Sequence, residues 1–329
     1  MQVTRGSTPA VPRPVALTIG NFDGIHRGHQ AVLARLMAEA RARGLPSAVL
    51  TFEPHPREFF DPQRAPTRLT SLREKLALLD AIGVDIVHVQ HFDRAFASLT
   101  AAEFIDPVLV RNLRAELVLI GDDFCFGAKR AGNFALLEQA SREKGFELIA
   151  MPTIGDAGQR ISSSAVRDAL RAGSLARARE LLGRHYSMTG RVIRGRQLGR
   201  ELGWPTANVQ LRHNRPPLTG IFAVRVHGAD SRPRDAVASL GYRPTVEDEG
   251  RPLLEVYLFD FAGDLYGKLL TVELLHKLRD EEKFDSLDAL KVQIARDCDE
   301  ARRLLRGEAV RLPPSLDREP LGSSLARAR

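Results

Sequence analysis

The sequence predicts a two-domain protein in which an α/β domain with a parallel sheet precedes a six-stranded β-barrel and a closing helix. The chain has 329 residues, of which 43% are hydrophobic, and this is enough to build two cores. From Val15 to about Gly183, short β-branched runs alternate with helical patterns, which indicates a parallel sheet covered on both faces. After Gly183, six strand patterns follow one another without helices between them, which favours a closed or nearly closed barrel.

The elements of the first half can be placed from apolar runs and helix-start signals. The strands are expected at the runs VALTIG, SAVLTF, VDIVHVQ, AELVLIG and FELIAM. The helices are expected to begin near Gly28, Ser71, Thr100, Asn133 and Ser162. Two of these starts carry a capping box, Ser71 with Glu74 and Thr100 with Glu103, which marks them as helix N-termini.

The second half is predicted to be the barrel. Its strands are expected at MTGRVIRG, TANVQL, IFAVRVHG, AVASLGY, LLEVYLFDF and KLLTVELLHKLR, with Gly, Pro and Asp turns between them. A helix is expected from about Ser286 to Leu305, where apolar residues recur at helical spacing. We expect domains at residues 1–183 and 184–312, with a disordered tail at residues 313–329.

Composition and charge limit the classes of partner. The formal charge of +7 is compatible with nucleic acid, an anionic surface or polyphosphate ligands, but many arginines fall on expected helix faces between residues 171 and 184. A solvated helix face is therefore favoured over a nucleic-acid patch. The N-terminal segment has no apolar core of a signal peptide, and no apolar run is long enough to cross a bilayer, so a cytoplasmic protein is expected.

Cysteine usage fits that compartment. The two cysteines, Cys125 and Cys298, are far apart in sequence and form no CxxC pair. We therefore expect two reduced thiols and no disulfide framework.

The segment GNFDGIHRGHQ, residues 20–30, predicts an anion site. It follows an apolar strand and opens a helix, and ligands of parallel α/β sheets collect where strands end and helices begin. Glycines let a ligand approach the backbone, and His26 and His29 add donors for a phosphoryl group. Two histidines at this spacing could also be surface residues or half of a metal site, but without a cysteine or a third ligand nearby a metal site is the poorer interpretation.

Four motifs of the first half resemble one known family. They are TIGNFDGIHRGHQ, TFEPHP at residues 51–56, GDDFCFG at 121–127 and ISSSAVR at 161–167. Together they resemble the HxGH nucleotidyltransferases, which have a Rossmann-like fold, and more closely the prokaryotic bifunctional riboflavin kinase/FAD synthetases. The motifs occur in the order of that family. Ser164 stands where the family usually has threonine and keeps the hydroxyl group.

The resemblance implies a role for each matched residue. His26 and His29 would be catalytic and would bind the ATP phosphates, in a cradle shaped by Gly20, Asn21, Gly24 and Gly28. From a later helix start the polyphosphate would be covered by Ser162, Ser163 and Arg167. Flavin contacts are assigned to His55 and Asp123, although a rigid turn and a strand cap are alternatives for these two residues. The implied chemistry is in-line attack of the FMN phosphate on the α-phosphorus of ATP, with Mg²⁺ bridging the phosphates and pyrophosphate leaving.

A second motif lies at residues 189–209, TGRVIRGRQLGRELGWPTANV. It is neither a P-loop nor a dinucleotide fingerprint. However, Thr206 and Asn208 lie two residues apart on an expected strand, so they share a face and can both offer oxygen to a hard cation. The segment resembles the flavokinase motif, and the family resemblance as a whole covers nearly all of residues 15–305.

This second resemblance implies a riboflavin kinase. Thr206 and Asn208 would bind Mg²⁺ and ATP, and Gly195 would bind ATP. Arg279 would contact the flavin, and Glu255 would take the proton of the riboflavin 5′-hydroxyl. We expect this base in a pocket of the barrel and not pointing outward. From the residues alone, a strand carboxylate that faces solvent is the favoured alternative. Tyr257 stands where many relatives have histidine.

The leading hypothesis is therefore one enzyme with two ATP-dependent steps, riboflavin to FMN in the barrel and FMN to FAD in the first domain. One alternative is a single-activity adenylyltransferase with a flavin-sensing barrel. Another is an RNA-binding protein, which the sequence pI of about 9.8 would allow, although no aromatic-studded basic strand supports it. The partners expected are ATP, riboflavin and FMN, without nucleic acid or membrane. The sequence leaves the oligomeric state open.

Overall fold

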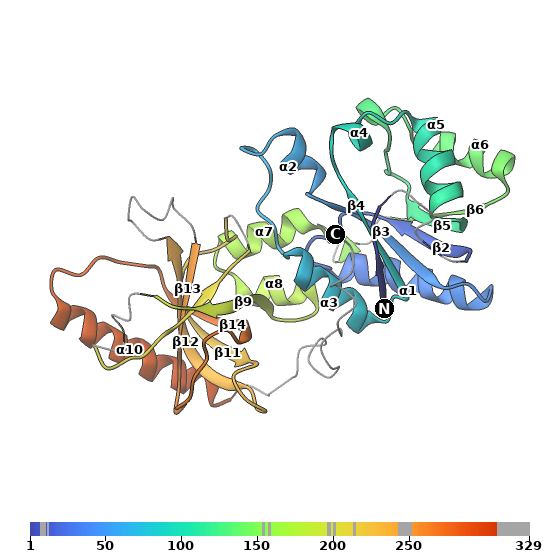
Figure 1. The fold of residues 1–329 in the computed structure, drawn as a ribbon. Helices are drawn as coiled ribbons and strands as arrows, with labels where there is room; N and C mark the ends of the chain where they lie inside the picture. Colours follow the sequence, from blue (N-terminus) through green and yellow to red (C-terminus); the bar gives the residue numbers. More distant parts are fainter. Residues whose placement is uncertain are drawn as a thin grey trace. The chain divides into compact units, whose positions relative to one another are not determined.

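The structure is a computed structural model of the chain. It describes residues 1–6, 11, 13–152, 155–156, 159–195, 199, 202–212, 215–242 and 252–307. Two compact units are present (Figure 1). The first unit comprises Met1–Pro66 and Lys75–Ser162, and the second unit comprises Thr67–Glu74 and the described residues from Ser163 onward.

The first unit is built on a six-stranded parallel sheet with the strand order β1-β4-β3-β2-β5-β6. The strands are β1 (Gln2–Thr4), β2 (Val15–Ile19), β3 (Ser47–Glu53), β4 (Ile86–His91), β5 (Ala115–Gly121) and β6 (Glu147–Met151). All five predicted strands are confirmed. The edge strand β1 was not predicted, because three residues are too few to show a periodic pattern. The order of the strands reverses between β2 and β5, and in such sheets this reversal point is where ligands bind.

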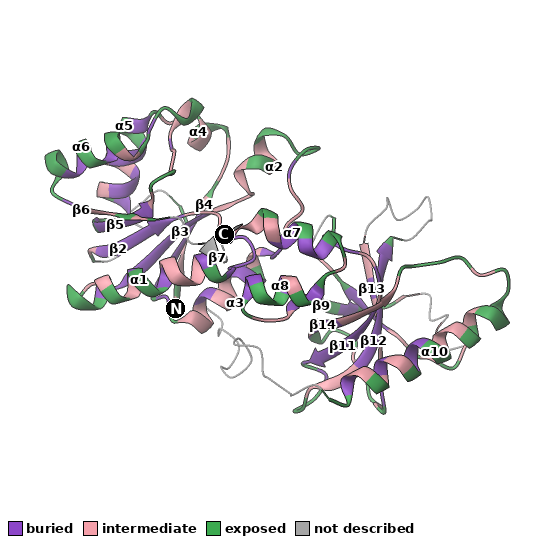
Figure 2. Cartoon of the chain, turned by 180° about the vertical axis from the view of Figure 1, so that it is seen from behind, coloured by how far each residue is buried: buried purple, intermediate pink, exposed green. Residues whose placement is uncertain are grey.

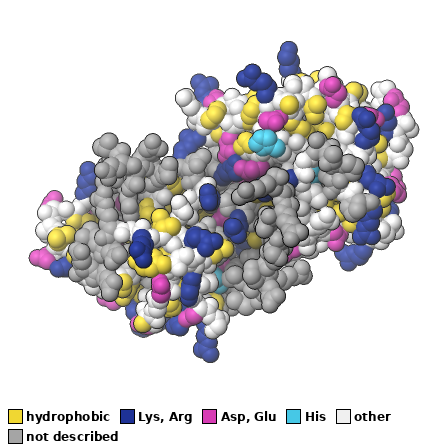
Figure 3. All heavy atoms as spheres, viewed as in Figure 1, with side chains coloured by type: hydrophobic (Ala, Val, Ile, Leu, Met, Phe, Trp, Pro, Cys, Tyr) yellow, Lys and Arg dark blue, Asp and Glu magenta, His cyan; other side chains and the backbone are white. Residues whose placement is uncertain are grey.

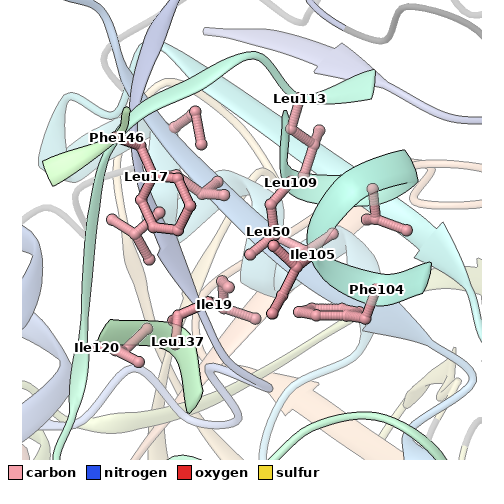
Figure 4. Packing of buried hydrophobic residues seen from close by; sticks show 14 of the residues in the cluster. Leu17, Ile19, Leu50, Phe104, Ile105, Leu109, Leu113, Ile120, Leu137 and Phe146 are labelled. Atoms are coloured by element: carbon pink, nitrogen blue, oxygen red, sulfur yellow. The ribbon is translucent and has the colours of Figure 1, made fainter. Parts of the chain in front are cut away.

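Helices cover both faces of this sheet (Figure 1). Ala16 of β2 packs in one cluster with Leu36 and Ala40 of α1 (Arg27–Ala42). The next residue, Leu17, faces the other side and belongs to the cluster of the π-helix η1 (Phe104–Asn112), which Figure 4 shows from close by. Strand side chains alternate between faces, so one strand contributes to two cores. Figure 2 shows the resulting burial along the central strands.

The remaining helices of the chain up to residue 144 confirm the predicted starts and add short turns. The predicted helices are α3 (Leu72–Ile82), α5 (Ala101–Glu103), which continues into η1, and α6 (Phe134–Lys144). Both capping boxes are formed: Glu74 accepts hydrogen bonds from the backbone and hydroxyl of Ser71, and Glu103 does the same for Thr100. The short elements that were not predicted are α2 (Pro56–Phe60), α4 (Arg94–Ala97), η2 (Ala128–Arg130), β7 (Gly155–Asp156) and β8 (Gln159–Arg160).

The second unit contains a closed antiparallel barrel with the order β10-β13-β12-β11-β14-β9, closed by pairing of β9 with β10. All six predicted strands are confirmed as β9 (Tyr186–Ile193), β10 (Ala207–Gln210), β11 (Gly220–His227), β12 (Arg234–Tyr242), β13 (Pro252–Leu258) and β14 (Leu269–Arg279). The helix predicted from Ser162 is α7 (Ser163–Arg171), and α8 (Leu175–Leu182) follows it and packs on β9 and β14.

The barrel has a filled interior and a second core on its outside. Phe222, Leu254 and Val256 are fully buried inside the wall. On the outer face, Ala223, Val237 and Leu275 pack against α10 (Leu287–Leu305), through Cys298, Ala301 and Leu305. The closing helix predicted from Ser286 is thereby confirmed. The expected disordered tail at residues 313–329 lies outside the described residues.

Two sequence expectations about the whole chain can be compared with the structure. Cys125 and Cys298 are both free thiols, as expected, and burial raises the pKa of the Cys298 thiol to about 11. Among the helices in the described ranges, none has the length and apolar character needed to cross a bilayer.

Two candidate active sites

Three of the four nucleotidyltransferase-like motifs meet at one edge of the parallel sheet. The first motif follows β2, the second ends β3, and the third follows β5, and β3 and β5 are the two neighbours of β2. Because parallel strands all end at the same edge, the three motifs converge there although 90 residues lie between the first and the third. This edge contains the point where the strand order reverses.

The loop between β2 and α1 needs unusual backbone geometry. Phe22, Gly24 and Ile25 all have positive φ angles, of 47°, 81° and 40°. The loop starts at Gly20, whose N–H donates to the carbonyl oxygen of Leu50 on β3 at 3.0 Å. It therefore follows a tight path anchored on the neighbouring strand, which positions the start of α1.

Gly28 brings the first and fourth motifs together. A Cβ at this position would lie 3.1 Å from the ring of His26 and 3.3 Å from the carbonyl oxygen of Ile161. Only a residue without a side chain fits between these atoms without displacing one of them. Ile161 and Ser162, which begin the ISSS segment, thus lie beside the helix start within the first unit.

His26 and His29 form a stacked pair at the N-terminus of α1. Their ring centroids lie 3.7 Å apart with an interplanar angle of 18°. His26 is the N-cap of the helix, and its Nδ1 accepts a hydrogen bond from the backbone N–H of His29 at 3.3 Å. This bond fixes the orientation of the His26 ring and leaves its Nε2 as the other hydrogen-bonding atom. Neither ring is turned out into solvent, since His26 is buried and His29 is half-buried.

Two buried polar atoms of this site have no hydrogen-bond partner within the described protein. They are Oδ1 of Asn21 and Nδ1 of His29. Buried polar atoms are normally satisfied, so an acceptor and a ring nitrogen left open at the end of β2 fit a polar ligand. Burial, His26 and the positive charge of Lys75 all hold the pKa of His29 well below its usual value of 6.5. The imidazole is therefore neutral in the ligand-free protein.

Lys75 and Thr51 are residues of this region that the sequence analysis missed. Lys75 is only 5% exposed, and its Nζ donates to the hydroxyl of Thr51 at 3.3 Å. The Thr51 hydroxyl in turn donates to the backbone carbonyl of Asn21 at 3.3 Å. A signal for Lys75 exists in the sequence, because it lies between Leu72 and Leu79 on one face of the predicted helix, where a solvated lysine is not expected.

The other residues predicted for the first site have various surroundings. His55 is the N-cap of α2, and its Nδ1 accepts from the backbone of Arg57 at 3.1 Å. Asp123 is exposed in the turn after β5. Arg167 on α7 is buried, and its Nε donates to the carbonyl oxygen of Thr67 at 2.5 Å. Ser163 and Arg167 belong to the second unit.

The second candidate site is spread over several strands of the barrel. Asn208 on β10 and Glu255 on β13 are direct partners across the strand pair, and Ser239 on β12 is the next partner of Glu255. Side chains that are paired in this way share one face of the sheet. Thr206 directly precedes β10, and together with Asn208 it lines a cavity of about 560 Å³ whose described lining does not include Glu255.

The face on which Glu255 lies differs from our expectation. Its neighbours Leu254 and Val256 are fully buried inside the barrel, whereas Tyr257 packs in the outer cluster with α10. Glu255 alternates with the buried residues and therefore points outward from the barrel wall. The expectation of a pocket within the barrel was wrong, because the lumen of a six-stranded barrel is filled by its own side chains.

Two further residues predicted for the second site have close partners. A Cβ on Gly195 would lie 2.4 Å from Nδ2 of Asn208, so this glycine allows the loop after β9 to pass over the amide. Arg279 at the end of β14 is engaged by Asp297 of α10, with Nε–Oδ1 and Nη2–Oδ2 distances of 3.0 and 2.8 Å. Its guanidinium group also lies 5.6 Å from the ring centroid of Phe284.

Possible metal ligands were sought among the described side chains. Within the described ranges, no group of three or more His, Cys, Asp or Glu side chains could hold a metal ion. Thr206 and Asn208 offer a hydroxyl and an amide oxygen to the cavity that both line. Such oxygens suit a hard cation that receives its remaining ligands from phosphate groups.

Comparison with protein families assigns the two halves. A FAD synthetase family model matches residues 8–165, and a riboflavin kinase family model matches residues 182–305. A bifunctional riboflavin kinase/FMN adenylyltransferase from Escherichia coli strain K12 is 52% identical over 85% of the chain and 90% of that protein. The chain belongs to this family of bifunctional riboflavin kinase/FMN adenylyltransferases. The predicted family, enzyme class and pair of activities are thereby confirmed.

Other relatives of this bifunctional family extend the comparison. The protein of the same description from Pseudomonas fluorescens is 48% identical and covers 94% of the chain and 100% of its own length. A crystal structure described as a macrolide-efflux protein from Streptococcus pneumoniae has a TM-score of 0.78 and 30% identity, over 92% of this chain and 99% of its own. That structure supports the predicted fold class, a parallel sheet followed by a closed barrel and a helix.

Proposed function

We propose that the two reactions of this family are divided between the two units. In the first unit, the phosphate of FMN attacks the α-phosphorus of ATP, and FAD and pyrophosphate form. In the second unit, the 5′-hydroxyl of riboflavin attacks the γ-phosphorus of ATP, and FMN and ADP form. The observation that carries this assignment is the pair of open buried atoms, Asn21 Oδ1 and His29 Nδ1, at the edge of the FAD synthetase-like sheet.

In the adenylyl transfer, His26 and His29 bind the phosphates of ATP at the N-terminus of α1. The stacked rings share one orientation, and the helix start adds backbone N–H groups and a favourable dipole. A bound polyphosphate places negative charge beside the neutral His29 and so favours protonation of its imidazole. The protonated ring then binds the phosphates more strongly as negative charge develops on them in the transition state. Gly20, Asn21, Gly24 and Gly28 shape the cradle.

The assignment of the remaining residues of the first site rests on the motifs. Ser162, Ser163 and Arg167 cover the polyphosphate, and His55 and Asp123 contact the flavin. His55 lies just after β3 and Asp123 just after β5, the two strands that flank β2. Both residues therefore lie at the ligand-binding edge of the sheet, which supports this role. No covalent intermediate with the protein is needed, so the protein contributes positioning and charge.

In the phosphoryl transfer, Glu255 accepts the proton of the riboflavin 5′-hydroxyl. Its register partner Asn208 lies on the same outer face and lines the cavity that we assign to ATP, so the base and the nucleotide are neighbours across one strand pair. The reaction therefore takes place on the outside of the barrel. A positioned base of this kind contributes roughly 10²- to 10⁴-fold to the rate.

We assign Mg²⁺ to the oxygens of Thr206 and Asn208, which both line the cavity, and we assign Gly195, which packs against the Asn208 amide, to the ATP site. When bound, the ion would neutralise charge on the phosphates. Arg279 is assigned to the flavin side, where its bonds to Asp297 hold the guanidinium group in one orientation.

We further propose domains at residues 1–183 and 184–312, a cytoplasmic location, and small molecules as the main partners. On the face drawn in Figure 3, Lys and Arg side chains are interspersed with acidic and apolar ones. That face is a poor match for nucleic acid, which selects a basic patch. A salt titration of RNA binding tests this, and we expect only weak binding without sequence preference.

The decisive experiment incubates the purified chain with riboflavin, ATP and Mg²⁺ and resolves the flavins by chromatography. We expect FMN first and FAD later, with pyrophosphate appearing only once FMN is present. If supplied FMN became FAD while riboflavin stayed unchanged, the barrel would be a sensor and the kinase assignment would be wrong. If neither flavin were converted, both assignments would be wrong.

A further inference from the structure

A buried lysine lies behind the nucleotide cradle of the first unit. Lys75 is on the core-facing side of α3 and is 5% exposed. Burying an ammonium group is costly, and lysine is among the residues that are least often buried. A lysine at this position therefore has a specific role, which is either to stabilise the fold or to position residues of the nucleotide cradle.

The hydrogen bonds of Lys75 lead directly to the cradle. Its Nζ donates to the hydroxyl of Thr51 on β3, which is fully buried. The Thr51 hydroxyl in turn donates a hydrogen bond to the backbone carbonyl oxygen of Asn21. The side-chain Oδ1 of Asn21 is one of the two buried atoms left open at the site. Lys75 thus braces the residue that presents an open polar atom to the ligand.

The charge of Lys75 also reaches the histidine pair. Three influences lower the pKa of His29, namely burial, His26 and Lys75. His26 is the N-cap of α1, whereas Lys75 belongs to α3. Asp23, a buried acid, lies in the same loop. A positive charge that is fixed in a low-dielectric environment acts more strongly on a polyphosphate than the same charge in water.

We propose that Lys75 is a positioning residue of the adenylyl-transfer site, which holds the end of β2 through Thr51 and adds a fixed positive charge beside His29. This inference rests on the proposed adenylyl transfer in the first unit. It deepens that proposal by adding a residue outside the four motifs.

The test uses three variants of the full chain. Lys75→Met keeps the apolar stem and removes the charge, Lys75→Arg keeps the charge, and Thr51→Val breaks the hydrogen-bond chain while the charge stays. We expect kcat/KM for the adenylylation of supplied FMN to fall about 10²-fold in Lys75→Met. We expect a smaller loss in Thr51→Val and the smallest in Lys75→Arg. Riboflavin phosphorylation in the second unit should stay at the wild-type rate, and the urea midpoint of the circular dichroism signal is the control for folding of the first unit.

A second readout separates this role from a purely structural one. In protein labelled with ¹⁵N-histidine, the pKa of His29 should rise in Lys75→Met, because a positive neighbour has been removed, and should stay near the wild-type value in Lys75→Arg. An unchanged pKa of His29, or equal losses of adenylylation in Lys75→Met and Lys75→Arg, would overturn the proposal. If the wild-type chain did not adenylylate FMN, the proposed function itself would fail, whatever the titration of His29 shows.

Discussion

The two candidate sites differ in how their residues come together. In the first unit, Asn21, His26 and His29 lie within nine positions of the chain, on one loop and one helix start. In the second unit, Asn208 and Glu255 are 47 positions apart and become neighbours only because β10 pairs with β13 in one register. A site made by a continuous segment can be recognised from local rules, whereas a site made by strand pairing depends on the whole sheet.

The sites also differ in what they offer to a ligand. The first presents buried polar atoms that lack a partner within the described protein, Asn21 Oδ1 and His29 Nδ1. The second presents a cavity of about 560 Å³ lined by Thr206 and Asn208. We infer that the first site depends on electrostatic preorganisation and the second on shape and one placed base.

The largest effects should come from removing one chemical group from each site. Glu255→Gln should lower the rate of riboflavin phosphorylation by roughly 10²- to 10⁴-fold, because no base takes the hydroxyl proton. His29→Ala should lower FMN adenylylation by roughly 10²- to 10³-fold, because a contact to the developing charge is lost. Each variant is the control of the other, and separate assays with riboflavin and with FMN measure both. If Glu255→Gln formed FMN at the normal rate, Glu255 would not be the general base.

A glycine in each site gives a finer comparison. In Gly195→Ala, the new Cβ would lie 2.4 Å from Nδ2 of the buried Asn208 amide, so the loop or the amide must move. In Gly28→Ala, the closest contacts would be 3.1 and 3.3 Å, which smaller shifts relieve. We expect about a 10²-fold loss of riboflavin phosphorylation in the first variant and about a tenfold loss of adenylylation in the second. Larger damage from Gly28→Ala would mean that the cradle is the more rigid site.

The two capping boxes provide a comparison of stability. Glu74 is buried and accepts bonds from Ser71 and, at 2.6 Å, from the backbone N–H of Thr189 at the start of the barrel. Glu74→Ala leaves these donors without a partner and should cost about 2 kcal/mol of unfolding free energy. The matched variant is Glu103→Ala in the exposed box of Thr100, where water replaces the carboxylate and the loss should be smaller. Urea unfolding followed by circular dichroism measures both, and equal losses would contradict the account.

The smallest expected effect is a dependence of stability on pH in the first unit. His88 on β4 is buried, bonded to Thr4 and Gln90, and burial holds its pKa below 6.5. The unfolded chain therefore binds the proton first, so stability should fall as the pH drops below about 6.5. His88→Asn should reduce this slope. Urea midpoints of the circular dichroism signal at several pH values measure the slope, and an identical slope in His88→Asn would contradict this assignment.

Much of the fold could be predicted because its signals are local. Five sheet strands, six barrel strands and the helix starts at Ser71, Thr100 and Ser286 carry apolar periodicity or a capping residue in the sequence itself. The edge strand β1 could not be predicted, because its three residues form a strand only by pairing with β4. The helix α2 was missed although it carries a local signal, since His55 caps it with Glu58 and Pro56 occupies its first turn. The stacking of His26 and His29 follows from their i, i+3 spacing on one helix start.

The parts of the sites that could not be predicted depend on long-range packing. The outward direction of Glu255 agrees with the alternative favoured from the residues alone and not with the expected pocket of the barrel. Alternation along β13 allows either face, and the register with β12 and the packing of α10 decide between them. Lys75 was missed because its partner Thr51 lies 24 positions earlier, on another element. Both cases show that a polar residue within an apolar pattern deserves a search for its partner.

The central claim is that the two reactions use separate sites. The most direct test mixes His29→Ala protein with Glu255→Gln protein, in the presence of riboflavin, ATP and Mg²⁺, and follows FAD by chromatography. We predict that the first variant alone makes FMN at the wild-type rate and FAD at least about 10²-fold more slowly than the wild type. The second variant alone should make FMN from riboflavin at least about 10²-fold more slowly, and the mixture should restore rapid FAD formation. FAD formation at the wild-type rate by the His29→Ala protein alone, or no restoration in the mixture, would contradict the account.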